Sequence, residues 1–122
     1  MRVNALAEKI HSNARDKGFW EGDRNVGEML MLAVSELSEA LEEHRDGKPL
    51  LYVPVHREAC QGGDEQGCDG LCKPEGVAVE IVDCVIRCFD TLKGMGVDDV
   101  AHLIERKMQY NATRAHRHGK AY

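Results

Sequence analysis

The chain has no long apolar segment and no excess of basic charge, and these two deficits exclude several classes of protein. Its longest stretch without Asp, Glu, Lys or Arg runs from Pro49 to His56, far short of the roughly 20 apolar residues that span a bilayer. Sixteen Lys and Arg against 21 Asp and Glu give a net charge of −5, which disfavours non-specific binding to a nucleic-acid polymer. We therefore expect no membrane-spanning helix and no nucleic-acid partner.

The N-terminal segment also lacks the uninterrupted apolar region of a secretory signal, because Arg2, Glu8, Lys9 and Arg15 are charged. We expect a cytoplasmic protein. Its five cysteines cannot all pair within one chain, and in a reducing compartment they are thiols or metal ligands rather than disulfides. The length of 122 residues suits a single domain.

Apolar residues recur every three or four positions in four segments, which is the period of an amphipathic helix. The segments are residues 3–17, about 24–46, 74–92 and 98–111. Pro74 and Glu75 have the composition of a first helical turn, and Gly94 and Gly96 follow the third segment as breakers. With no convincing strand, this pattern predicts an all-α fold of the four-helix-bundle type in one domain, residues 1–122, with a basic tail over about 113–122.

Residues 47–73 separate the second helix from the third, and this connection is much longer than the roughly two to eight residues usual in bundles. We interpret it as an inserted loop. Four side chains in it are potential zinc ligands: His56, Cys60, Cys68 and Cys72. No Cys-x2-Cys pair occurs among them, so we expect a mobile, thiol-bearing loop, with a structural zinc site as the alternative. Cys84 and Cys88, in the third helix, are expected to be small buried residues.

Two pairs of carboxylates lie on the second and third helices at a spacing of three residues. Glu36 and Glu39 share one side of the second helix, and Glu43 extends the same stripe. Glu80 and Asp83 interrupt the most apolar helix of the chain. If the two helices pack together, the four carboxylates converge, and repulsion and desolvation oppose folding unless a cation neutralises them.

Magnesium is the cation that best suits such a group, with manganese as the alternative, because it prefers oxygen ligands and bridges carboxylates to phosphates. Zinc is disfavoured because it prefers nitrogen and sulfur donors. A di-iron centre would require Glu-x-x-His motifs on the helices that carry the acids, and the sequence has one such motif, Glu8-Lys-Ile-His11, outside both carboxylate pairs. The structural alternative is that the acids lie on solvated helix faces.

These carboxylates and the segments around them resemble the MazG-like family of all-α nucleoside triphosphate pyrophosphohydrolases, whose signature is Glu-x-x-Glu followed by Glu-x-x-Asp. Glu36, Glu39, Glu80 and Asp83 match that signature. The resemblance extends to Lys17-Gly-Phe-Trp20, Arg24-Asn25, Ser35-Glu-Leu-Ser-Glu-Ala-Leu-Glu42, Lys73-Pro-Glu-Gly76, Lys107-Met-Gln-Tyr-Asn111, Arg114 and His118-Gly-Lys120. It covers most of the chain outside the loop, and the long connection from Glu39 to Glu80 departs from it.

The resemblance implies magnesium-dependent hydrolysis of a nucleoside triphosphate, of the ribo or deoxy series, to the monophosphate and pyrophosphate. Such an activity cleanses the nucleotide pool. The metal would be held by Glu36, Glu39, Glu80 and Asp83, and we hypothesise that Glu39 also orients or deprotonates the attacking water. A homodimer or homotetramer is expected, partly from the family and partly because the apolar face of the third helix is wide.

Candidate nucleotide contacts lie near both ends of the chain. Lys107, Asn111 and Arg114 follow the i, i+4, i+7 spacing of one helix face and suit phosphate and sugar or base. Residues 117–120 add basic side chains that suit a phosphate clamp or a solvated tail. Three further candidates near the N-terminus have either a nucleotide-binding or a structural interpretation. Trp20 would stack on a base or anchor its turn, and Arg24 and Asn25 would contact nucleotide or cap the second helix.

Arg87, one turn beyond Asp83, is expected to pair with a carboxylate, and His11 to be a packed or surface residue rather than a ligand. The competing function is a helical metal- or nucleotide-binding or protein-interaction module without catalysis. It predicts no magnesium-dependent turnover.

Overall fold

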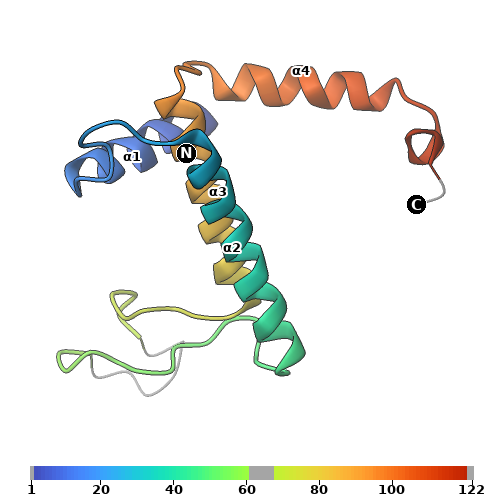
Figure 1. The fold of residues 1–122 in the computed structure, drawn as a ribbon. Helices are drawn as coiled ribbons and strands as arrows, with labels where there is room; N and C mark the ends of the chain where they lie inside the picture. Colours follow the sequence, from blue (N-terminus) through green and yellow to red (C-terminus); the bar gives the residue numbers. More distant parts are fainter. Residues whose placement is uncertain (1, 61–67, 121–122) are drawn as a thin grey trace. The chain divides into compact units, whose positions relative to one another are not determined.

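The computed structural model describes residues 2–60 and 68–120, and over these residues the chain is helical without a β-strand (Figure 1). Its elements are α1 (Val3–Asp16), α2 (Val26–Arg45), α3 (Val77–Gly94), α4 (Val100–Ala112) and a 3-10 helix, η1 (His116–Gly119). The predicted all-α class is confirmed for this part of the chain. The portions of the predicted loop and tail at 61–67 and 121–122 lie outside the described residues. None of the described helices has both the length and the apolar character to cross a membrane.

Short polar side chains begin two of the helices. The Asn25 side chain caps α2, since its Oδ1 accepts a hydrogen bond from the Glu28 amide at 3.0 Å. Asp99 does the same for α4 by accepting from the His102 amide at 3.0 Å. These caps explain why α2 and α4 each begin two residues later than the apolar period indicated.

The chain divides into two compact units. The first unit comprises Met1–Asp23 and Phe89–Tyr122, and the second comprises Arg24–Cys88. In the first unit α1 contacts α4, and Ala7 and Val100 are fully buried. Asn4 ties the two helices together, because its amide donates to Asp99 Oδ1 and its oxygen accepts from the Ala101 amide, both at 2.9 Å.

A buried polar group joins the turn after α1 to the last part of α3 within the first unit. Asp90 Oδ1 accepts a hydrogen bond from Trp20 Nε1 at 2.8 Å and lies 2.7 Å from His11 Nδ1. The Trp20 ring lies so close to Gly94 that a Cβ there would collide with it. The prediction that the third helix ends before Gly94 is wrong, since α3 includes this residue, and the absence of a side chain there leaves room for the Trp20 ring.

The second unit contains α2 and the part of α3 up to Cys88, which run in opposite directions. Glu36 of α2 pairs with Arg87 of α3, whereas Glu43, further along α2, contacts Tyr52 at the base of the loop that leads to α3. Met29, Ala33 and Ala40 are buried on α2. The long connection thus links two antiparallel helices.

The prediction that Pro74 and Glu75 form the first turn of the third helix is wrong. Glu75 instead forms an isolated antiparallel bridge with Tyr52, through two backbone hydrogen bonds of 2.8 and 2.9 Å. Gly76 follows with φ of 122°, and a Cβ at this position would collide with the Leu50 carbonyl. That carbonyl accepts from the Ala78 amide at 3.1 Å, so the helix begins at Val77.

Candidate functional site

The two helices of the second unit bring the predicted carboxylates together. Oxygens of Glu36, Glu80 and Asp83 all lie within 4.8 Å of one another. The Glu36 side chain is buried, with 8% of the residue exposed, and Glu80 and Asp83 are half-buried. Three of the four predicted ligands therefore form one cluster, which we call the carboxylate cluster.

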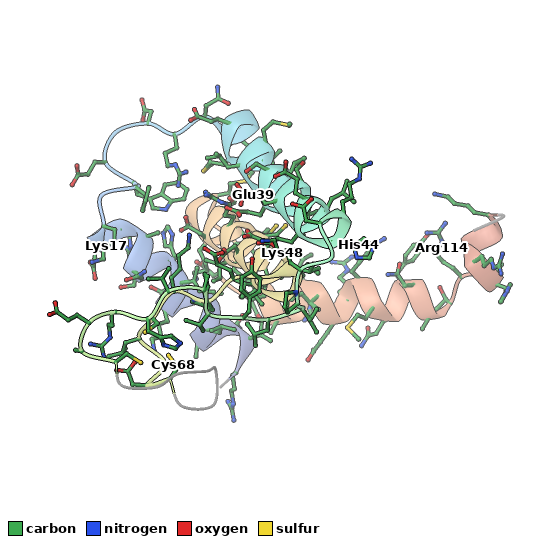
Figure 2. The ribbon with its side chains drawn as sticks, turned by 90° about the horizontal axis from the view of Figure 1, so that it is seen from below. Lys17, Glu39, His44, Lys48, Cys68 and Arg114 are labelled. Carbon is green, nitrogen blue, oxygen red and sulfur yellow. The ribbon has the colours of Figure 1, made fainter. Side chains whose placement is uncertain are left out.

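Glu39 lies beside the carboxylate cluster but outside its tightest group. It contributes to the pKa shifts of both Glu36 and Glu80, yet its own side chain on α2, labelled in Figure 2, is exposed. The i, i+3 spacing placed Glu39 on the correct side of the helix. Its different exposure gives it access to solvent water that Glu36 does not have.

Arg87 forms an ion pair with the carboxylate cluster. Its Nε donates to Glu36 Oε1 at 2.7 Å, which confirms the prediction that Arg87 pairs with a carboxylate. Burial alone would raise the pKa of Glu36, but the hydrogen bond and charge of Arg87 outweigh it and hold the pKa below the usual range. Glu36 is therefore an anion already partly neutralised by the protein.

The pKa values of the remaining two carboxylates are raised instead of lowered. Burial, reinforced by hydrogen bonds with Glu39 and Glu36, raises the pKa of Glu80 to about 7. Burial and the Glu36 charge also raise the pKa of Asp83, although Arg87 offsets part of this effect. Arg87 and the charge of Lys73, which also lowers the pKa of Asp83, offset only part of this repulsion, and a proton or a cation would compensate the remainder.

An open hollow of about 410 Å³ adjoins the cluster in the second unit. Its lining is mainly acidic: Glu39, Glu42, Glu43, Asp46, Lys48, Tyr52, Glu75 and Glu80. Lys48 is its single basic residue. A hollow of this charge would repel the phosphates of a nucleotide unless divalent cations lay between them.

Tyr52 organises the far side of this hollow. Its hydroxyl donates to both oxygens of Glu43, at 2.9 and 3.0 Å. Burial and the Glu43 carboxylate raise the pKa of Tyr52 to about 12, so the hydroxyl stays protonated and keeps Glu43 as its acceptor. The sequence analysis missed Tyr52. The signal available was an aromatic residue within an apolar run at the start of the loop.

The donor chemistry of the carboxylate cluster fits magnesium or manganese, since three oxygen-bearing side chains from two helices converge. One Glu36 oxygen is committed to Arg87, so a bound cation would share this residue with the guanidinium. The excess negative charge around Glu80 and Asp83 marks their side of the cluster as the more favourable one for a cation.

The predicted nucleotide contacts near the C-terminus belong to the first unit. Lys107 and Arg114 lie over the ring of Tyr110, with the Lys107 Nζ 4.9 Å and the Arg114 guanidinium carbon 5.8 Å from its centroid. Arg114 follows the end of α4 instead of lying on its face. Asn111 Oδ1 is buried and has no hydrogen-bond partner in the part of the chain that the structure describes. Tyr110 is part of the segment that resembles the family, but its contact with the two cations was not predicted.

Trp20 belongs to the first unit, whereas Arg24 and Asn25 belong to the second. Trp20 packs on Gly94 and donates to Asp90 within the first unit, contacts that suit the anchoring interpretation. Asn25 is the cap of α2 in the second unit, and Arg24 precedes it there as a half-buried residue. His11 contacts Asp90 in the first unit, in agreement with the prediction of a packed residue.

The loop donors are gathered more closely than the sequence spacing indicated. Ligand atoms of His56, Cys60, Cys68 and Cys72 lie within 4.8 Å of one another, and Figure 2 shows the sulfur atoms near Cys68. Burial raises the pKa of the Cys72 thiol, while the Arg57 amide opposes that rise. On α3, Cys84 is half-buried and Cys88 is exposed, so the prediction of a buried residue at 88 is wrong.

Comparison with known proteins adds no relative to these observations: no family model matches the chain, nor does any curated protein or solved structure.

Proposed function

We propose that the protein is a magnesium-dependent nucleoside triphosphate pyrophosphohydrolase, which converts a ribo- or deoxynucleoside triphosphate and water to the monophosphate and pyrophosphate. The observation that carries the proposal is the carboxylate cluster, where Glu36, Glu80 and Asp83 meet from two antiparallel helices. The resemblance of these residues and their flanking segments to MazG-like enzymes supports the same reaction. The all-helical character of the described residues is compatible with that family.

The electrostatics of the cluster argue for a role beyond helix solubility. Glu80 and Asp83 interrupt the apolar face of α3 at half-buried positions, and burial raises the pKa of both. Burying these two acids destabilises their ionised forms and so lowers the stability of the fold. Acids on a solvated helix face have no such cost. A divalent cation bound there would neutralise charge on the cluster and on the phosphates of the substrate.

Within this proposal the four acids have different tasks. Glu80, Asp83 and Glu36 hold the cation, and Arg87 fixes the position of Glu36. Glu39, which is exposed and contributes to the pKa shifts of Glu36 and Glu80, orients a water for attack on the phosphate and accepts its proton. Tyr52 keeps Glu43 turned towards the loop base.

The resemblance also implies nucleotide contacts at Lys107, Asn111 and Arg114, which belong to the first unit. Lys107 and Arg114 are held by Tyr110 as a pair of cations for phosphate oxygens. The unpartnered Oδ1 of Asn111 accepts a hydrogen bond from a sugar hydroxyl or a base amine. These contacts are part of the proposal.

The test is pyrophosphate release from a panel of ribo- and deoxynucleoside triphosphates, with magnesium and with manganese. We expect turnover with at least one nucleotide and its loss on removal of the divalent metal. Glu80→Gln should abolish release, whereas Glu28→Gln should retain it, since Glu28 lies on α2 near its capped end and away from the cluster.

The two catalytic roles separate in a second pair of variants. Glu39→Gln should lower kcat while magnesium still protects the folded protein against denaturation, whereas Asp83→Asn should weaken that protection. Full activity of Glu39→Gln would refute the role assigned to Glu39. No release from any nucleotide by folded, magnesium-loaded protein would favour a binding module instead.

We also propose a homodimer or homotetramer acting in the cytoplasm. Large apolar side chains on α2 are exposed, for example 55% of Leu30 and 63% of Met31, and Val82 on α3 is similarly open. Burial of these side chains between copies would stabilise an oligomer. Light scattering of the full chain should give at least twice the monomer mass of 13.6 kDa, and a monomer at working concentration would contradict this.

A further inference from the structure

The long loop between α2 and α3 contains a second cluster of metal-binding side chains, separate from the acidic one. His56, Cys60, Cys68 and Cys72 form two pairs, each with three intervening residues, a spacing within the range that zinc sites use. The two pairs lie on opposite sides of residues 61–67, yet their ligand atoms all lie within 4.8 Å of one another. Two stretches of the loop therefore converge on one point.

Two distances within this cluster match those expected around a single tetrahedral zinc ion. Zn–S bonds of about 2.3 Å and Zn–N bonds of about 2.0 Å place two sulfurs about 3.8 Å apart and a sulfur and a nitrogen about 3.5 Å apart. The Sγ atoms of Cys60 and Cys68 are 3.9 Å apart, and Cys60 Sγ is 3.4 Å from His56 Nδ1. These separations exceed a covalent disulfide of about 2.05 Å.

A backbone contact next to the cluster suits a sulfur ligand. The Arg57 amide donates to Cys72 Sγ at 3.3 Å, and hydrogen bonds of this kind orient the ligands of a metal site. Cys72 is 7% exposed, so the site is shielded on one side. The Arg57 guanidinium also forms an ion pair with Asp69, next to Cys68, which joins the two stretches of loop beside the cluster.

We infer that His56, Cys60, Cys68 and Cys72 bind one structural zinc ion. Three sulfurs and one imidazole nitrogen complete a four-coordinate shell, so no position is left for a substrate or a reactive water. Magnesium is a poor occupant because it prefers oxygen ligands. The ion joins the stretch that carries His56 and Cys60 to the stretch that carries Cys68 and Cys72. Metal binding thereby supplies folding energy to this glycine-rich segment. The inference is independent of the proposed hydrolase activity.

The test is the metal content of the full chain, expressed in zinc-supplemented medium and purified without chelators. Elemental analysis should give about one zinc per chain for the wild type. Cys68→Ser should lose most of this zinc. The matched control is Cys88→Ser, because Cys88 is an exposed cysteine on α3 outside the cluster and its replacement should leave the zinc content unchanged.

Two measurements on the wild type keep the test independent of whether a variant folds. Alkylation of the native protein should modify Cys88 rapidly and leave Cys60, Cys68 and Cys72 protected until zinc is removed by a chelator. Protein produced with cobalt in place of zinc should show the intense visible absorption of tetrahedral cobalt with thiolate ligands. Absence of stoichiometric zinc, equal alkylation of all the thiols, or zinc retained by Cys68→Ser would overturn the inference, as would iron found in its place.

Discussion

Without metal, the wild-type protein should become less stable as the pH rises towards neutrality. Glu80→Gln should not show this part of the decrease. The folded protein holds the Glu80 proton up to a pH of about 7, whereas the ordinary pKa of this side chain is 4.5. Its contribution to stability is therefore fully present below pH 4.5 and is lost as the pH rises through about 7. Asp83, whose pKa is also raised, acts in the same direction.

The magnitude follows from the size of the pKa change. One pKa unit corresponds to about 1.4 kcal/mol, and the half-buried position of Glu80 lets solvent screen part of the effect. We expect the free energy of unfolding to fall by roughly 1 to 3 kcal/mol across this range. Glu36 does not cancel the effect, because its pKa is lowered and its contribution is lost only as the pH falls below the usual range of a glutamate.

The assay is urea denaturation at a series of pH values in magnesium-free buffer, for the wild type and for Glu80→Gln. The difference between the two curves isolates Glu80, because the histidines and other acids are common to both proteins. Above pH 7 the variant should be the more stable of the two without magnesium. Adding magnesium should stabilise the wild type by RT ln(1 + [Mg]/Kd) and stabilise the variant less.

Glu28→Gln is the matched control and should follow the wild-type pH dependence, since Glu28 lies outside the cluster on α2. A difference curve that stays flat from acid to neutral pH would refute the reasoning. It would mean that Glu80 is ionised in the folded protein without any compensating cation, and that burial of the cluster does not govern its charge.

Two further predictions concern contacts that hold each unit together. Tyr52→Phe removes the hydroxyl that donates to Glu43 at 2.9 and 3.0 Å. Thermal or urea denaturation should show that the free energy of unfolding falls by about 1 to 2 kcal/mol. Tyr110→Phe is the matched control, and an equal loss of stability there would contradict the assignment. Gly94→Ala places a methyl group against the Trp20 ring and should lower the free energy of unfolding by about 1 to 3 kcal/mol. The fluorescence of this single tryptophan should also shift. Unchanged emission would show that the ring does not lie there.

The helices could be predicted from the sequence because their apolar residues repeat with the helical period, which is local information. Glu36, Glu39, Glu80 and Asp83 could be brought together by the same reasoning, since two adjacent amphipathic helices have one obvious way to pack their faces. Which acid is partly neutralised could not be predicted. That depends on the reach of Arg87 across to α2, a contact between residues 51 positions apart in the chain.

The start of α3 and the arrangement of the loop could not be read from periodicity. Pro74 and Glu75 have the composition of a first helical turn, but the Tyr52 backbone competes for the hydrogen bonds of Glu75 and pulls the chain into an extended form. The convergence of Cys60 and Cys68 with the other loop donors is likewise a result of turns and ion pairs between distant positions. Such contacts leave no repeating pattern in a sequence.

The backbone hydrogen bonds at the base of the loop make the segment between Tyr52 and Glu75 replaceable. Tyr52 and Glu75 hold each other through both backbone hydrogen bonds, and the Leu50 carbonyl accepts from the start of α3. Since the two ends are fixed there, lengthening the segment between them costs only about 0.6 kcal/mol for each doubling. Natural variation or engineering can therefore exchange the intervening residues for a short turn or for a different ligand-binding module, while the register of the two carboxylate helices stays as it is.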